Sequence, residues 1–169
     1  MISCVMNRRS VRAYTGEKIP DELVHQLLQA GMVAPSAHNS RPYEFIVVRD
    51  KTLLKKLADI RVYWKMLTHA DLAIVVVANL TDYKSSITDF FVQDCAAATQ
   101  NILVAAEGLS LGGVWLGCYP TKDGMSGVRN ALHIPNEIIP FSIISLGIPA
   151  EHPHPHTSFD DFRIHCDTY

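Results

Sequence analysis

Three arginines and a serine lie close together near the start of the chain, at Arg8, Arg9, Ser10 and Arg12. A guanidinium group can donate two parallel hydrogen bonds to phosphate oxygens, and a serine hydroxyl adds a donor of another kind. Residues 8, 10 and 12 share one side of an extended segment, whereas residues 8, 9 and 12 share one face of a helix. Both backbone conformations allow the donors to converge on an anion. A solvated basic edge is the alternative explanation of the same spacing.

Two further stretches suit contact with a flat ligand. Residues 35–40 have the sequence PSAHNS, in which small residues allow close approach of the backbone and Asn39 offers a donor and an acceptor. In the stretch GGVWLGCYP, Gly117 interrupts a strand where the backbone could meet a ligand. A surface turn and a packing glycine are the respective alternatives. The dinucleotide motif GxGxxG and the phosphate loop GxxxxGK[ST] are both absent from the sequence.

Nucleophilic and metal-dependent chemistry has less support. His152, His154 and His156 alternate along the tail, so they fall on one side of an extended segment. No cysteine or acidic cluster joins them in the sequence, and adventitious metal binding fits them better than a functional metal site. The sequence contains no GxSxG motif and no serine or cysteine with a recognisable local base. We therefore predict neither a catalytic side chain nor a metal site.

The composition is that of a single globular domain spanning residues 1–169. Its 48% hydrophobic and 19% charged residues exclude a disordered chain. A net charge of −2 gives no general attraction to nucleic acid or to an anionic membrane, so any anion recognition is local. The four cysteines lie far apart, which predicts reduced thiols rather than a disulfide framework. Because no signal-peptide pattern and no membrane-spanning apolar run are visible, we expect a cytoplasmic location.

Alternating helical and strand patterns predict the elements that position these motifs. Helices are expected over residues 20–33, 51–60, 88–109 and 126–132, and strands over residues 43–49, 72–79, 113–119 and 141–149. Pro20 suits the first turn of the first helix, and Pro35 ends it. The pattern predicts an α/β or α+β sandwich in which helices pack on a central sheet.

The helix expected over residues 88–109 is apolar on nearly every side. Such a helix has to be covered from several directions, and a domain of this size can hardly surround it alone. We therefore expect a second subunit to share it, with a core helix inside one subunit as the alternative. Residues 150–169 have no helical period and contain several prolines and histidines, so we expect an extended arm on the body or on a partner.

Taken in order, these motifs resemble the nitroreductase family of FMN-dependent oxidoreductases, and its short members in particular. The resemblance rests on RRSVRAY, APSAHNSRPYEFIVV, ADLAIVVVAN, GLSLGGVWLGCYP and ISLGIPAEHP, which together span most of the chain. It implies a three-layer sandwich with a mostly antiparallel central sheet flanked by helices. It also implies a homodimer with FMN at the subunit interface, in which the arm of residues 150–169 could be exchanged between subunits.

The resemblance assigns roles to the two polar stretches. The residues that would contact the FMN phosphate, ribityl chain or pyrimidine edge are Arg8, Arg9, Ser10 and Arg12. The residues that would close on the flavin from the partner subunit are Pro35, Ser36, Ala37 and Asn39. Among the three arginines, Arg12 is the candidate for stabilising the reduced, anionic flavin.

The resemblance also assigns roles to the strand and the tail. Leu116, Gly117 and Cys118 would lie along the flavin ring, with a backbone N–H near its N5 atom. His154 and His156 stand where short relatives carry basic residues that help to hold the phosphate. Because histidine is mostly neutral near neutral pH, we expect weaker FMN retention than in those relatives.

The implied activity is that of an FMN-dependent NAD(P)H oxidoreductase. It would reduce nitroaromatic, quinone or similar flat small-molecule acceptors by ping-pong hydride transfer through flavin N5. The alternative is a flavin-binding protein that stores, carries or senses FMN with little turnover. The depleted basic charge of the tail and the short segment between Asn79 and Phe90 keep that alternative open.

Overall fold

The structure is a computed structural model that describes residues 2–86, 89–154 and 159–169. The α-helices are α1 (Ile2–Asn7), α2 (Asp21–Met32), α3 (Lys51–Ile60), α4 (Phe90–Gly108) and α5 (Lys122–Leu132). The strands are β1 (Tyr43–Val48), β2 (Leu72–Asn79), β3 (Gly112–Gly117) and β4 (Ile138–Gly147). Three 3₁₀ helices complete the described chain, η1 (Ala37–Asn39), η2 (Val62–Thr68) and η3 (Asp161–Arg163).

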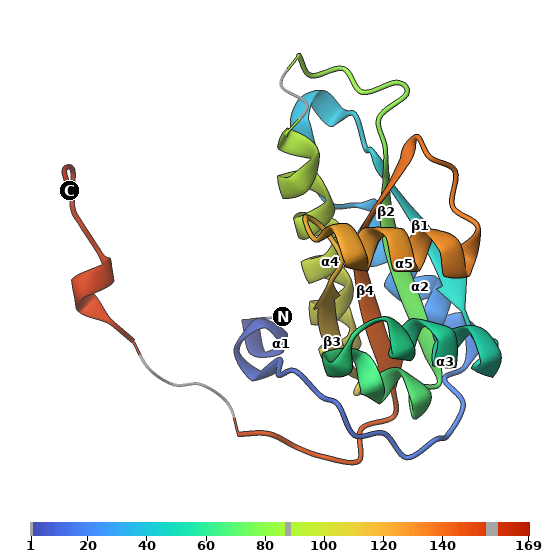
Figure 1. Ribbon diagram of the computed structural model, residues 1–169. Coiled ribbons are helices and arrows are strands. Elements are labelled where there is room, and N and C mark those ends of the chain that lie inside the picture. The colour runs from blue at the N-terminus through green and yellow to red at the C-terminus, as the bar shows by residue number, and fades with distance from the viewer. Residues whose placement is uncertain (1, 87–88, 155–158) are drawn as a thin grey trace.

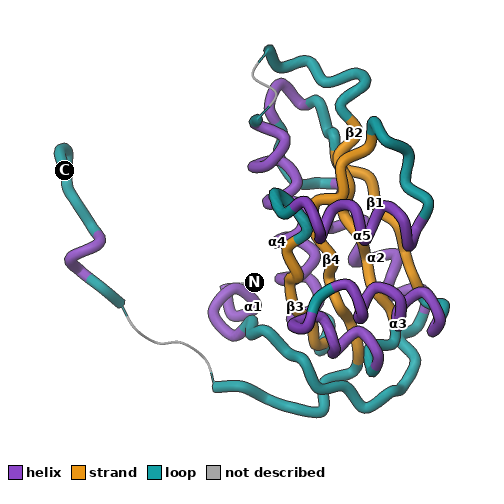
Figure 2. The backbone as a smooth tube through the Cα atoms, in the orientation of Figure 1, coloured by secondary structure: helices purple, strands orange, loops and turns teal. Residues whose placement is uncertain are grey.

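The strands form one antiparallel sheet in the order β1-β2-β4-β3 (Figures 1 and 2). Strand β2 is buried along almost its whole length, and its residues alternate between two separate hydrophobic clusters. One cluster joins the sheet to α2 and α4, and the other joins it to α3, η2 and α5. Because both faces of the sheet are covered, the continuous apolar run of β2 is explained. The predicted three-layer α+β sandwich is therefore confirmed.

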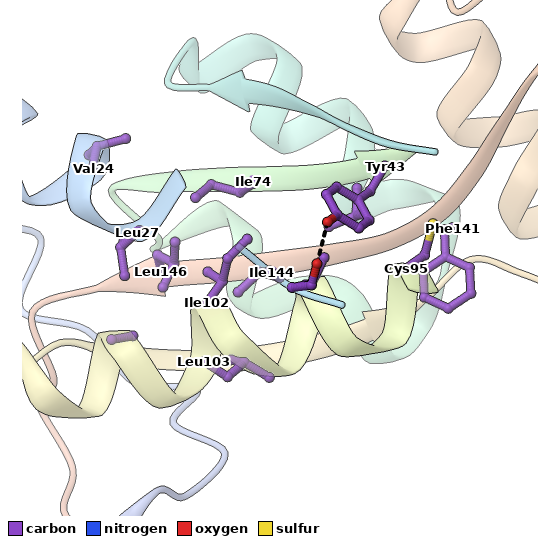
Figure 3. Packing of buried hydrophobic residues seen from close by; sticks show 14 of the residues in the cluster. Val24, Leu27, Tyr43, Ile74, Cys95, Ile102, Leu103, Phe141, Ile144 and Leu146 are labelled. Atoms are coloured by element: carbon purple, nitrogen blue, oxygen red, sulfur yellow. Dashed lines mark hydrogen bonds between the residues drawn. The ribbon is translucent and has the colours of Figure 1, made fainter. Parts of the chain in front are cut away.

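Helix α4 contributes the centre of the first cluster (Figure 3). Cys95 and Ile102 on this helix are fully buried, and Leu103 is almost fully buried. The opposite side of α4 is covered less completely within the chain, because Val92 and Ala96 are only half-buried. The chain therefore buries one side of the apolar helix and leaves apolar side chains of the other side partly open to solvent.

All the predicted helices and strands are present, but their bounds differ in places. Helix α5 begins at Lys122 rather than near residue 126. The glycines of this stretch lower its helix propensity, which hides the first turn in the sequence. One of them has a packing role, because a Cβ atom at Gly127 would lie 2.7 Å from a side-chain carbon of Ile60 on α3. Tertiary contact thus outweighs local propensity here.

Candidate functional site

The segment that carries the arginines lies in extended form beside the edge strand β3. Ser10 forms a parallel bridge with Gly113, and the Val11 N–H donates to the Gly113 carbonyl at 3.0 Å. Of the two backbone conformations considered for this segment, the extended one is therefore present at Ser10 and Val11. Helix α1 ends just before it, at Asn7, so Arg8 stands at the junction of the helix and the extended segment.

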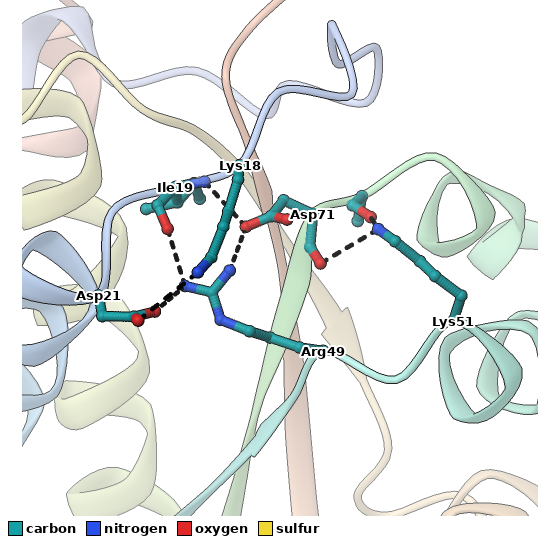
Figure 4. A network of polar contacts seen from close by, with 7 residues as sticks. Lys18, Ile19, Asp21, Arg49, Lys51 and Asp71 are labelled. Atoms are coloured by element: carbon teal, nitrogen blue, oxygen red, sulfur yellow. Dashed lines mark hydrogen bonds and ion pairs between the residues drawn. The ribbon is translucent and has the colours of Figure 1, made fainter.

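Two groups of contacts fix this segment to the sheet. The Tyr14 hydroxyl donates to the Val11 carbonyl at 2.9 Å and contacts the Ser145 hydroxyl at 3.0 Å. Further along, Arg49 forms an ion pair with Asp71 at 2.6 Å and donates to the Ile19 carbonyl at 2.8 Å (Figure 4). A charged group with little solvent around it needs such partners, and here they join the first 20 residues to β1 and β2.

Tyr14 should make the stability of the fold sensitive to alkaline pH. Burial raises the pKa of Tyr14 from about 10 to about 12. Since the folded protein favours the neutral phenol, the stabilisation from Tyr14 is complete below about pH 10 and is lost as the pH rises toward about 12.

Tyr14→Phe should lose about 1–2 kcal/mol of unfolding free energy near neutral pH, because its hydroxyl bonds are gone. Above about pH 10 the variant should decline less steeply than the wild type in urea denaturation. Parallel pH profiles for the two proteins would contradict this expectation.

The tail also contacts this segment. The Glu151 carboxylate accepts hydrogen bonds from the backbone N–H groups of Arg12, at 2.6 Å, and Ala13, at 3.1 Å. The Arg9 Nε–H donates to the His154 carbonyl at 2.7 Å, and one of its terminal nitrogens donates to the Arg8 carbonyl. The other terminal nitrogen, Nη2, is buried and has no hydrogen-bond acceptor among the described residues. Arg9 therefore links the segment to the tail and retains one unsatisfied donor.

A cavity of about 880 Å³ opens beside the guanidinium-bearing segment. It is lined by Arg12, by Trp115, Leu116 and Gly117 of β3, and by residues of η2. A Cβ atom placed on Gly117 would meet no heavy atom within 4 Å, so the space beside this residue is open. The Gly113 carbonyl accepts the Val11 N–H on the edge of β3 that faces away from β4. Alternate residues of a strand direct their backbone N–H groups to the same edge. Trp115 and Gly117 therefore present backbone N–H groups along the open edge of the strand.

Two cationic residues of this cavity escaped the sequence reasoning. Arg61 and Lys65 lie on or beside η2, in a stretch without a recognisable motif, and only the fold brings them to the cavity. Arg61 pairs with Asp123 at 2.9 Å, and Lys65 pairs with Asp59 at 2.6 Å. Arg12, by contrast, has no carboxylate ion-pair partner within the described part of the chain. Of these three cations, Arg12 is the one free to meet a ligand's negative charge.

The second polar stretch lies away from this cavity. None of residues 35–41 lines it. In Figure 1 the light-blue turn before β1 lies at the upper end of the sheet, whereas the dark-blue N-terminal segment passes below the lower end. The stretch PSAHNS therefore does not meet the arginine cluster within one subunit.

Known proteins resemble this chain over most of its length. The profile of the nitroreductase family matches residues 5–62 and 60–148. The chain belongs to the nitroreductase family. A relative from Methanothermobacter thermautotrophicus, provisionally named NADH dehydrogenase/NAD(P)H nitroreductase, is 43% identical over 169 residues, which is 100% of this chain and 87% of the relative.

Solved structures of nitroreductases have the same fold. An FMN-dependent nitroreductase from Clostridium difficile R20291 superposes with a TM-score of 0.92 at 28% identity, covering 100% of both chains. A provisionally named nitroreductase from Desulfovibrio desulfuricans, solved in complex with FMN, superposes with a TM-score of 0.86 at 29% identity. That alignment covers 99% of this chain and 96% of the other.

Three further residues of this nitroreductase chain were predicted to contact FMN, and they are Cys118, His154 and His156. The Cys118 side chain is fully buried in the cluster beneath α5, and burial raises the pKa of its thiol to about 12. Its N–H donates to the Phe141 carbonyl, so neither group of Cys118 is free for a ligand. His154 contributes its carbonyl to Arg9, and His156 lies outside the described residues.

Three general properties follow from the described ranges. The four cysteines are free in the structure. Among the described residues, no group of three or more His, Cys, Asp and Glu side chains is arranged to hold a metal ion. Nor does any helix in those ranges have the length and apolar character needed to cross a lipid bilayer.

Proposed function

We propose that this protein is an FMN-dependent NAD(P)H oxidoreductase that reduces flat acceptors such as nitroaromatics and quinones. The observation that carries the proposal is the cavity in which the unpaired Arg12 guanidinium meets the open edge of β3 at Gly117. The relatives support the choice of cofactor, because they include an FMN reductase of Bacillus subtilis and a nitroreductase solved with FMN.

The residues present fit a flat cofactor that carries a phosphate. The open space at Gly117 accommodates a planar ring beside the strand, since no heavy atom lies within 4 Å of its absent Cβ position. The buried Arg9 Nη2 needs an acceptor, and a phosphate oxygen would provide one. Arg8 and Ser10 belong to the same segment and are further candidates for the phosphate and ribityl chain.

Bound FMN would supply the redox chemistry, since its N5 atom accepts hydride from a nicotinamide and passes it to an acceptor. The protein's own residues bind and orient. The Arg12 charge would lower the free energy of an anionic reduced flavin, and the Gly117 N–H would donate a hydrogen bond at the ring edge. Because one cavity serves both substrates, they would use it in turn, which gives ping-pong kinetics.

We further propose that two subunits complete the site. The half-buried apolar side of α4 needs a cover, and the segment of residues 159–169 stands away from the body with Phe159 and Phe162 about three-quarters exposed (Figure 1). Exposed aromatic side chains in an extended arm are typical of a contact with another chain. A second copy would cover both surfaces and would bring its residues Pro35, Ser36, Ala37 and Asn39 toward the first subunit's flavin.

One anaerobic titration tests the proposed function. The purified protein, reconstituted with FMN, should lose its flavin absorbance when NADH or NADPH is added and regain it with a nitroaromatic or a quinone. The same preparation should sediment as a dimer. A flavin-bound protein that neither nicotinamide reduces would favour the storage, carrier or sensor alternative. A protein that cannot be reconstituted with FMN would refute the proposal.

A further inference from the structure

The loop over residues 35–41 has an unfavourable backbone. His38, Asn39 and Arg41 have φ values of 52°, 54° and 47°, which lie in the left-handed region. That region costs free energy for most residues other than glycine, although asparagine tolerates it better than the other two. Three such residues within four positions make the loop dependent on the hydrogen bonds that hold it, both within the loop and from outside it.

Asp94 on α4 supplies the central contact. It is 5% exposed, and its Oδ1 atom accepts the Ala37 N–H at 2.9 Å. Its Oδ2 atom accepts the Tyr83 hydroxyl at 2.8 Å. No lysine or arginine pairs with it in the described ranges. A buried carboxylate without a cation depends on its hydrogen bonds, and these two come from separate segments of the chain.

The same two segments are also joined directly. The Lys84 N–H donates to the Ser40 hydroxyl oxygen at 3.2 Å. Burial raises the pKa of Tyr83, and the hydrogen bond to Asp94 raises it further, so the phenol stays protonated and remains a donor near neutral pH. Segment 80–86, which follows β2, is therefore attached to the loop and to α4 at once.

Contacts inside the loop leave one side-chain donor available for a ligand. The Ser36 hydroxyl oxygen accepts the Arg41 N–H at 2.9 Å, and the Asn39 side-chain oxygen accepts the Arg41 Nε–H at 2.9 Å. The Ser36 hydroxyl also interacts with the Tyr43 side chain. The amide nitrogen of Asn39 donates to no other described residue, so the loop is held from the α4 side while this donor remains unused.

We propose that Asp94 is a positioning residue that presents the loop of residues 35–41 to the flavin of the partner subunit, and that Tyr83 links segment 80–86 to the same carboxylate. This inference rests on the proposed function, because it assumes that the loop closes on FMN. Asp94 itself is buried beneath the loop and touches neither cofactor nor substrate. Its effect passes through the shape of the loop.

Four variants test the inference in the reconstituted full-length dimer. Asp94→Ala should raise the Kd for FMN about tenfold, since it removes charge-assisted bonds on which the loop depends. Asp94→Asn keeps an acceptor for Ala37 and should stay within about threefold of the wild type. Tyr83→Phe loses one of the two bonds and should raise the Kd about threefold. Asn101→Ala is the matched control, because Asn101 also lies on α4 and donates to a backbone carbonyl, that of Ala30 on α2.

The control separates positioning from general stability. Asn101→Ala should lower the denaturation midpoint and leave the FMN Kd unchanged, whereas Asp94→Ala should change both. Equal Kd values for Asp94→Ala and the wild type would overturn the inference, and so would an equal rise in Kd for the control. If Asp94→Ala does not fold, Tyr83→Phe decides, and an unchanged Kd there overturns it. A wild-type protein that binds no FMN would refute the proposed function instead.

Discussion

Arg12→Ala is expected to raise the Kd for FMN between about tenfold and a hundredfold, the loss that follows when a charge-assisted hydrogen bond is removed. Arg12 lines the large cavity and has no carboxylate partner among the described residues. Its charge is therefore free for a ligand, unlike the charges of Arg61 and Lys65. The midpoint potential of the remaining bound flavin should also become more negative, because the anionic reduced form loses its cation. Fluorescence titration gives the Kd, and reduction against a reference dye gives the potential.

Arg61→Ala is the control for this experiment. Arg61 lines the same cavity, but its guanidinium group bonds both oxygens of Asp123 at 2.9–3.0 Å. Its removal should change FMN affinity by less than about threefold, since a charge that is already paired contributes less to a new ligand. Equal losses in the two variants would mean that general positive charge, rather than the position of Arg12, governs binding. Wild-type affinity in Arg12→Ala would show that the cavity beside β3 is not the flavin site.

Elements with strong local signals could be predicted from the sequence. Strand β2 is a continuous apolar run, and helix α4 is apolar on nearly every side, so both were found close to their true bounds. The first turn of α5 was missed because its glycines lower the helix propensity, and the close packing of Gly124 against Thr121 and of Gly127 against Ile60 is not visible in any local pattern. The 3₁₀ helix η2 was missed for a related reason. Its buried residues, Trp64 and Leu67, are three positions apart, which a helix allows, but two positions are too few to establish a period.

The sequence predicted only part of the candidate site. The rest consists of residues that are far apart in the sequence and close together in the fold. Arg12 and Gly117 are far apart in the sequence, but they line one cavity because residues 10–11 lie beside β3. Arg61 and Lys65 line the same cavity and carry no motif. The anchoring role of Asp94 was equally invisible, since its two partners come from residues 37 and 83. Only the folded chain brings such groups together.

Gly147→Ala should destabilise the protein by about 2–4 kcal/mol, the combined cost of overpacking and of lost hydrogen bonds. A Cβ atom at Gly147 would lie 2.6 Å from carbons of the Tyr14 ring, which is closer than Cβ contacts occur. The ring would have to move, and its bonds to Val11 and Ser145 would break. The arginine-bearing segment would lose an anchor, so FMN binding should weaken along with stability.

Gly117→Ala provides the contrast, because its Cβ atom would enter open space. Its unfolding free energy should stay within about 0.5 kcal/mol of the wild type, as for substitutions that meet no neighbour. The added methyl group would nevertheless occupy the cavity beside the strand, and the FMN Kd should rise about tenfold. Urea denaturation without FMN and fluorescence titration with FMN separate the two effects.

If Gly117→Ala binds FMN like the wild type, the flavin does not lie along this edge of β3. If Gly147→Ala is as stable as the wild type, Tyr14 does not fix the segment. The glycine pair thus distinguishes the residue that faces the ligand from the residue that holds the ligand-binding segment in place.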